Sequence, residues 1–116
     1  MNINPLLQQA EGVLGVPVYP SAADVSAPGD NYIVYEYLDE RVQLYADDTD
    51  AYDMTNIRVH WFMTSGVQQA KRKLRKFLRS KGFTIVSTSE DYEANTNLHH
   101  ISVDADIGGY IDEEDD

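Results

Sequence analysis

The segment from Ser65 to Gly82 constrains the fold most, because it has the pattern of an amphipathic helix. Ser65 and Gln68 have the spacing of a capping box, and Gly82 is a typical residue for ending a helix. Its apolar residues recur at helical spacing and would form one buried stripe, made of Val67, Ala70, Leu74, Phe77 and Leu78. The sequence therefore predicts a helix that packs this stripe on a sheet and turns its other faces outward.

Seven of the nine basic residues of the chain lie on or directly after this predicted helix. They are Lys71, Arg72, Lys73, Arg75, Lys76, Arg79 and Lys81. Because the 116-residue chain has a formal net charge of −11, the residues outside this group carry about −18. A chain divided in this way is a strong electrostatic dipole, with two surfaces that can attract each other.

The segments before this helix predict a short helix and several strands. Asn4 can cap a helix that begins at Pro5 and ends at Gly12 or Gly15. VPVYP should be extended, and residues 21–31 should form a loop. Residues 32–46 are rich in β-branched and aromatic residues, and Asp39-Glu40 is the expected bend between two strands or within one long strand.

Two further strands have clear faces. Met54 to Met63 should turn Ile57, Val59, Trp61 and Met63 inward and Arg58, His60 and Phe62 outward. LHHISVDADI should turn Ile101, Val103 and Ala105 inward, after a strand FTIVSTS and a turn EDYEANTN. The order of elements predicts an α+β fold: an antiparallel sheet of about four to five strands with two helices packed on one face. We expect one domain over residues 1–107 and an acidic, disordered tail at 108–116.

The sequence offers few candidate catalytic residues. His99 and His100 lie near Asp104 and Asp106, but adjacent strand residues face opposite ways and cannot easily share one ion. DADIGGYIDEED resembles a calcium loop, yet Gly108 stands at the fifth position, where an oxygen ligand belongs, and Asp115 stands where a bidentate Glu is expected. There is no cysteine, phosphate loop or nucleophile elbow. We therefore expect a non-enzyme with no metal and no cofactor. Without a signal peptide or a membrane span in the sequence, we expect it to be soluble and intracellular.

The basic segment 67–81 allows several interpretations. It could bind nucleic acid, although the acidic remainder would repel phosphate and its polar face has no aromatic residue for stacking. The chain could instead be an acidic mimic of DNA, which a concentrated cationic patch does not suit. In a third hypothesis, the cationic face of one subunit meets the acidic face of the next, and the contact closes into a ring. A helix with a merely solvated cationic face is the remaining alternative.

The order of elements resembles that of the tail-terminator, or tail-completion, proteins of long-tailed bacteriophages. Three sequence segments resemble them too: GVPVY, YIVYEY and KGF…Y…T…LHHISVD. The resemblance covers residues 5 to 107. It implies a structural subunit of the virion that forms a ring, usually a hexamer, on the head-proximal end of the tail tube. Such a ring ends tube polymerisation and docks to the head connector or head-completion protein. DNA would pass through its channel without specific binding, and another neck protein is the related alternative.

On this basis we expect partners that are all proteins: a second copy of the chain, the tail tube protein and the head connector. The seven basic residues would contact a subunit or a partner. Acidic residues of the loop at 46–53 would dock or face the channel; these are Asp47, Asp48, Asp50 and Asp53.

Overall fold

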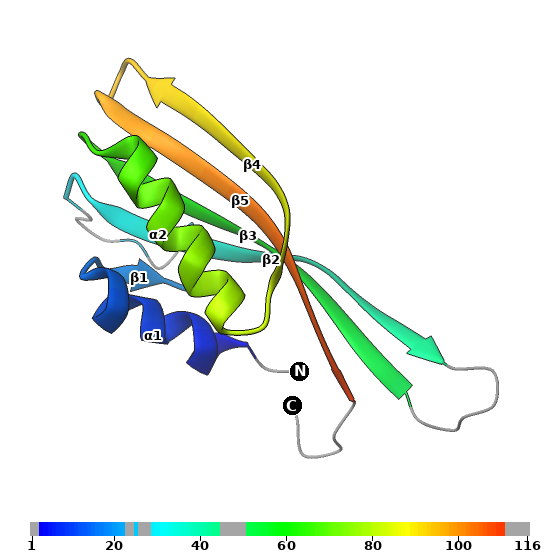
Figure 1. The fold of residues 1–116 in the computed structure, drawn as a ribbon. Helices are drawn as coiled ribbons and strands as arrows, with labels where there is room; N and C mark the ends of the chain where they lie inside the picture. Colours follow the sequence, from blue (N-terminus) through cyan, green and yellow to red (C-terminus); the bar gives the residue numbers. More distant parts are fainter. Residues whose placement is uncertain (1–2, 23–24, 26–28, 45–50, 111–116) are drawn as a thin grey trace.

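The computed structural model describes residues 3–22, 25, 29–44 and 51–110. Its elements are, in chain order, α1 (Asn4–Leu14), β1 (Val18–Tyr19), β2 (Tyr32–Leu44), β3 (Ala51–Met63), α2 (Val67–Ser80), β4 (Thr84–Glu93) and β5 (Leu98–Tyr110). The strands form one sheet in the order β1-β2-β3-β5-β4, and both helices cover the same face of it (Figure 1). The predicted α+β architecture is confirmed.

All strand pairs are antiparallel except that of β1 with β2. β1 is only two residues long and pairs Val18 with Ile33 in parallel. β2 is one long strand, which agrees with the second predicted form, and its register is irregular between Tyr37 and Asp39, just before the predicted bend at Asp39-Glu40. The bulge redirects the strand, because an extra residue increases its local twist.

The apolar stripe of α2 packs on the sheet as the sequence predicts. Leu74, Phe77 and Leu78 are at most 4% exposed. They join one core with the inward residues of the two central strands, Ile57, Val59, Trp61, Met63, Ile101, Val103 and Ala105. The alternation of buried and half-buried residues along β3 and β5 confirms the predicted strand faces.

α1 is held to the sheet by polar contacts as well as by buried Leu7 and Ala10. The hydroxyl of Tyr35, itself 1% exposed, donates to Asn4 Oδ1 at 2.7 Å and accepts a hydrogen bond from Gln8 at 3.3 Å. The predicted role of Asn4 as helix cap is wrong: Ile3 is the N-cap residue, and Asn4 lies in the first turn. Tyr35 uses the side-chain oxygen that would otherwise cap. Gly15, not Gly12, ends the helix in a left-handed conformation.

The capping box predicted for α2 is not formed. The N-cap is Gly66, with φ 79°, and no side chain caps the helix. Glycine adopts this left-handed conformation without steric cost, so the chain turns one residue later than predicted. The side chain of Gln68 instead donates to Glu90 Oε1 on β4, at 3.2 Å.

The predicted end of α2 at Gly82 is confirmed by a Schellman motif. The N–H of Phe83 donates to the Leu78 carbonyl at 3.0 Å, and that of Gly82 donates to the Arg79 carbonyl at 3.1 Å. Gly82 has φ 95°, a conformation that side chains other than glycine rarely adopt. The motif brings the chain directly from the helix into β4.

Strands extend further than the sequence indicates. β4 continues through Glu90–Glu93, so the turn occupies only 94–97 rather than the predicted EDYEANTN. β5 continues through Tyr110, where Gly108 pairs with Met54 and Gly109 with Asp53. Residues 108–110 therefore belong to the sheet and not to a tail, because backbone pairing with β3 satisfies their polar groups. The remaining residues of the predicted tail, 111–116, lie outside the described part of the chain.

Truncating Leu74 tests whether the stripe of α2 carries the core. Leu74→Ala should lower the free energy of unfolding by about 2–5 kcal/mol through lost burial and a cavity. Val13→Ala is the matched control, since Val13 on α1 is 65% exposed and its loss should change stability by less than about 0.5 kcal/mol. Denaturant melts that give equal values for both variants would contradict this packing.

Candidate functional site

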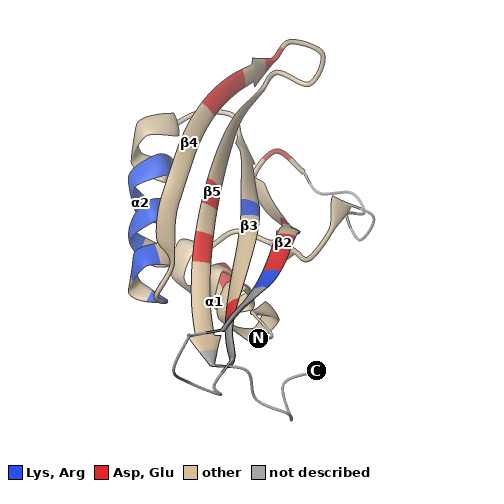
Figure 2. Ribbon diagram, turned by 90° about the vertical axis from the view of Figure 1, so that its right-hand side faces the viewer, with Lys and Arg blue, Asp and Glu red and all other residues tan. Residues whose placement is uncertain are grey.

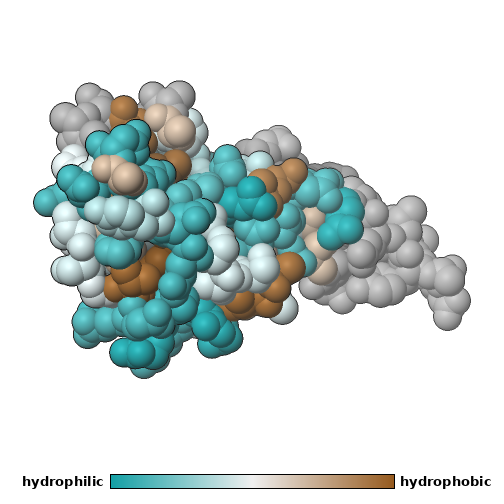
Figure 3. Space-filling view, turned by 90° about the horizontal axis from the view of Figure 1, so that it is seen from above, coloured by the Kyte–Doolittle hydropathy of each residue, from teal (hydrophilic) through white to brown (hydrophobic). Residues whose placement is uncertain are grey.

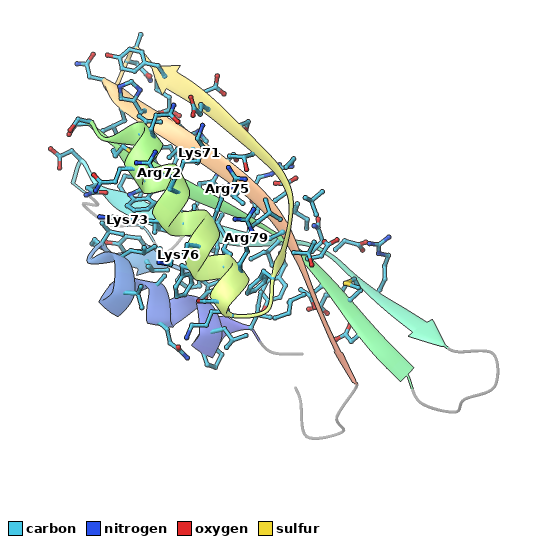
Figure 4. The ribbon with its side chains drawn as sticks, viewed as in Figure 1. Lys71, Arg72, Lys73, Arg75, Lys76 and Arg79 are labelled. Carbon is cyan, nitrogen blue, oxygen red and sulfur yellow. The ribbon has the colours of Figure 1, made fainter. Side chains whose placement is uncertain are left out.

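Four exposed basic residues of α2 form what we call the cationic face: Arg72, Lys73, Lys76 and Arg79. Arg72, Lys76 and Arg79 lie at helical spacing on one stripe, opposite the apolar stripe that packs on the sheet. No carboxylate of the described residues forms an ion pair with any of the four. Figure 4 labels these four side chains along α2, together with Lys71 and Arg75.

The other three basic residues of the predicted group are half-buried rather than exposed. Lys71 pairs with Glu90 on β4, and this hydrogen bond holds the pKa of the Glu90 carboxyl below its ordinary value. Lys81 contacts Gln9 of α1 and lies 5.8 Å from the ring centre of Phe77. Arg75 is half-buried. The predicted interface of seven residues is therefore divided by the structure into four exposed and three half-buried residues.

The second surface is the open face, the side of the sheet that no helix covers. Figure 2 shows basic residues along α2 and acidic residues on strands β2, β4 and β5. The open face presents outward residues of the central strands, Asn56, Arg58, His60 and Phe62 on β3 and His100, Ser102, Asp104 and Asp106 on β5. Because α2 and the open face lie on opposite sides of the sheet, the positive and the negative surface of the subunit face in opposite directions.

Cross-strand polar pairs order the open face. Arg58 donates to both carboxylate oxygens of Asp104, at 2.7 and 3.0 Å, which raises the pKa of the guanidinium. Asn56 donates to Asp106 at 2.6 Å on the same pair of strands. Each pair joins residues directly opposite one another in the register. Arg58 is thereby satisfied internally, and the open face is acidic overall.

A chain of polar contacts crosses the open face through two histidines. His60 Nδ1 and His100 Nε2 lie 2.7 Å apart and share a hydrogen bond. The other nitrogen of each ring faces a carboxylate: His60 Nε2 lies 3.3 Å from Glu36, and His100 Nδ1 lies 3.8 Å from Glu93. The contacts therefore run across four strands, β2, β3, β5 and β4.

The environment favours neutral His100. Burial lowers the pKa of His100 below the ordinary 6.5, and the neighbouring His60 lowers it further, whereas Glu93 and Asp91 oppose the shift. A hydrogen bond between two ring nitrogens also needs one of them to be an acceptor, which a doubly protonated pair lacks. Within the described residues, no group of three or more histidine or acidic side chains could hold a metal ion.

The structure places His99 and His100 on opposite faces, as strand alternation predicts. His99 packs against Tyr92 with ring centres 4.9 Å apart, and His100 joins His60 on the open face. The histidine pair itself was not predicted. Its members are 40 residues apart, and only the register of β3 with β5 brings them together.

Of the four acidic residues predicted to lie in a loop at 46–53, the structure describes one, Asp53. Asp47, Asp48 and Asp50 lie outside the described residues. Asp53 is not in a loop: it pairs with Val42 and Gly109 as part of β3 and is only 7% exposed. Strand pairing on both sides of this position excludes the turn that was predicted there.

Apolar surface is limited on the side of the molecule seen in Figure 3, where small hydrophobic patches are separated by hydrophilic atoms. Neither helix in the described ranges is long and apolar enough to cross a membrane.

Comparisons with known proteins support the fold. No family model matches this chain, and no curated protein sequence does so at a significant level. Among solved structures, a chain from the "virion of native gene transfer agent (GTA) particle" is similar to it, with a TM-score of 0.52. The sequence identity is 15%, and the match covers 85% of this chain and 84% of that chain. The likeness is one of fold.

Acidification should weaken the folded state through His100. Because its pKa is lowered on folding, the unfolded chain takes up this proton first. The stabilisation is complete above the unfolded value of 6.5 and is lost as the pH falls through the lower folded value. Thermal melts should show the wild type losing stability from pH 7.5 to 5.5, and His100→Gln losing less. Equal losses in the two proteins would show that His100 does not titrate in this way.

Proposed function

We propose that this chain is a structural subunit of a phage-like virion and acts as a tail terminator. It forms a ring on the head-proximal end of the tail tube, ends tube polymerisation and provides the surface for the head-joining protein, while DNA passes through the channel. The fold shared with a chain of a gene transfer agent virion over most of its length is the observation that carries the proposal. The resemblance in order of elements to tail terminators supports the finer role.

The charge distribution supports assembly of the subunits into a ring. The cationic face and the acidic open face lie on opposite sides of one sheet, so one face of a subunit can contact the opposite face of the next. Such a heterologous contact closes into a ring when the rotation between subunits permits it. A contact between like faces would instead bring cations against cations, which is unfavourable.

Nucleic-acid binding by α2 is the competing function, and the site supports it less well. Four exposed cations could neutralise phosphates, but the four have no aromatic side chain among them for stacking on a base. The acidic remainder of the chain would also repel a polyanion. The cationic face suits a protein carboxylate surface better.

Charge reversal of the cationic face tests the proposal. Lys73→Glu/Lys76→Glu/Arg79→Glu should leave the thermal melt largely unchanged, because all three side chains are exposed. It should abolish assembly, because like charges would then meet across the contact. Light scattering gives the mass, and negative-stain images show whether rings form.

Two comparisons make that test decisive. Lys73→Arg/Lys76→Arg keeps both charges, leaves Arg72 and Arg79 in place and should still assemble. Normal assembly of the charge-reversed variant at low and moderate salt would refute the cationic contact. Tight binding of random-sequence duplex DNA, weakening steeply with added salt, would favour the nucleic-acid function instead.

A further inference from the structure

A groove on the open face combines aromatic rings with a carboxylate. Its volume is about 450 Å³, within the range of about 300–1,000 Å³ typical of binding pockets. The lining residues come from β2, β3 and β5 and from the segment before β2: Ala22, Val25, Tyr32, Val34, Glu36, His60, Phe62 and His100. None of the helix residues takes part in this lining.

The rings in the groove form a continuous stack. Tyr32 and Phe62 are stacked with ring centres 4.8 Å apart, and Phe62 stacks on His100 at 4.3 Å. His60 continues the row beside His100, and its other nitrogen faces Glu36, whose side chain is 49% exposed. Both faces of Phe62 are covered by its neighbours in the row, so the row offers apolar ring edges beside an accessible carboxylate, a combination that favours a cationic side chain with an apolar stem.

The surrounding charges decide what kind of group can enter. An aromatic row on an open sheet face would also suit a nucleobase. However, Glu36 and Glu93 lie beside its two histidines, and the nearby guanidinium of Arg58 is already held by Asp104. Phosphates would be repelled here. The groove therefore favours a cationic protein side chain over nucleic acid.

The chain itself presents such side chains on its opposite side. Arg72 and Arg79 are exposed, lie two turns apart on the cationic face and form no ion pair with the described carboxylates. We propose that the groove on the open face binds an arginine of α2, Arg72 or Arg79, from a second copy of this chain. This inference rests on the proposed ring and names the contact that joins one subunit to the next.

Arginine, rather than charge alone, is the specific element of this contact. A guanidinium can donate two parallel hydrogen bonds to the Glu36 carboxylate while its stem packs on the ring edges of Phe62 and Tyr32, whereas a lysine ammonium offers only a point charge. Arg72→Lys/Arg79→Lys keeps the net charge and should weaken self-association by about tenfold. Association of the lysine variant equal to that of the wild type would overturn the arginine assignment.

Variants of the groove test the other side of the contact. Glu36→Gln and Phe62→Leu should each weaken association by about tenfold, because the first removes the carboxylate and the second removes the ring on which the arginine stem packs. Phe62→Leu keeps apolar bulk, and its melt checks the fold. Glu40→Gln is the matched control: Glu40 is an exposed acid of the same strand beyond the bulge, paired with buried Thr55, and should behave as the wild type.

Mixing two variants that cannot assemble alone tests for a head-to-tail contact. Glu36→Lys lacks a working groove and Arg72→Glu/Arg79→Glu lacks the arginines, so neither should assemble alone. Each still carries the other half of the contact, so the mixture should form heterodimers, detected as a doubling of mass, and no rings.

The outcomes separate the two proposals. If the wild type forms rings and the groove variants form them equally well, the groove inference is overturned and the ring function stands. If the wild type remains monomeric at every concentration, both proposals fail. Single-stranded DNA binding that is lost in Phe62→Leu would overturn the arginine assignment in favour of a nucleobase.

Discussion

The packing of the α2 stripe on one face of the sheet is the constraint on which the rest of the structure depends. Leu74, Phe77 and Leu78 are almost fully buried, in one core with the inward residues of β3 and β5. Once these side chains fix the rotation of the helix, its charged residues must lie on the remaining faces. The core therefore sets the position of the cationic face, although the charges contribute nothing to the core itself.

The same packing leaves the other side of the sheet without a helix, and that side has a different chemistry. In each central strand, every second residue points into the core, and the residues between them point to the open face. On β3, buried Val59 and Trp61 alternate with half-buried Arg58, His60 and Phe62. A strand pattern that satisfies the core thus also generates a row of aromatic, histidine and acidic side chains on the opposite surface.

Much of this arrangement could be predicted from the sequence, because it depends on local periodicity. The apolar stripe of α2, the end at Gly82 and the faces of β3 and β5 follow from spacing within one element. The start of α2 could not be predicted in the same way, since a capping box and the left-handed Gly66 compete for neighbouring positions. The histidine pair could not be predicted for another reason: His60 and His100 belong to strands whose register is set by tertiary packing.

The central claim is that the cationic face of one subunit contacts the open face of the next, and cross-linking measures this contact directly. The chain has no cysteine, so engineered thiols are the only ones present. Gln69→Cys places a thiol one turn before Lys73 on α2, and Ser89→Cys places one on β4 opposite Ser102, which lies 3.3 Å from His60. With a short bismaleimide, the double variant should give a ladder of covalent oligomers, and each single variant should remain monomeric. Dimers from either single variant, with no ladder from the double variant, would contradict the account.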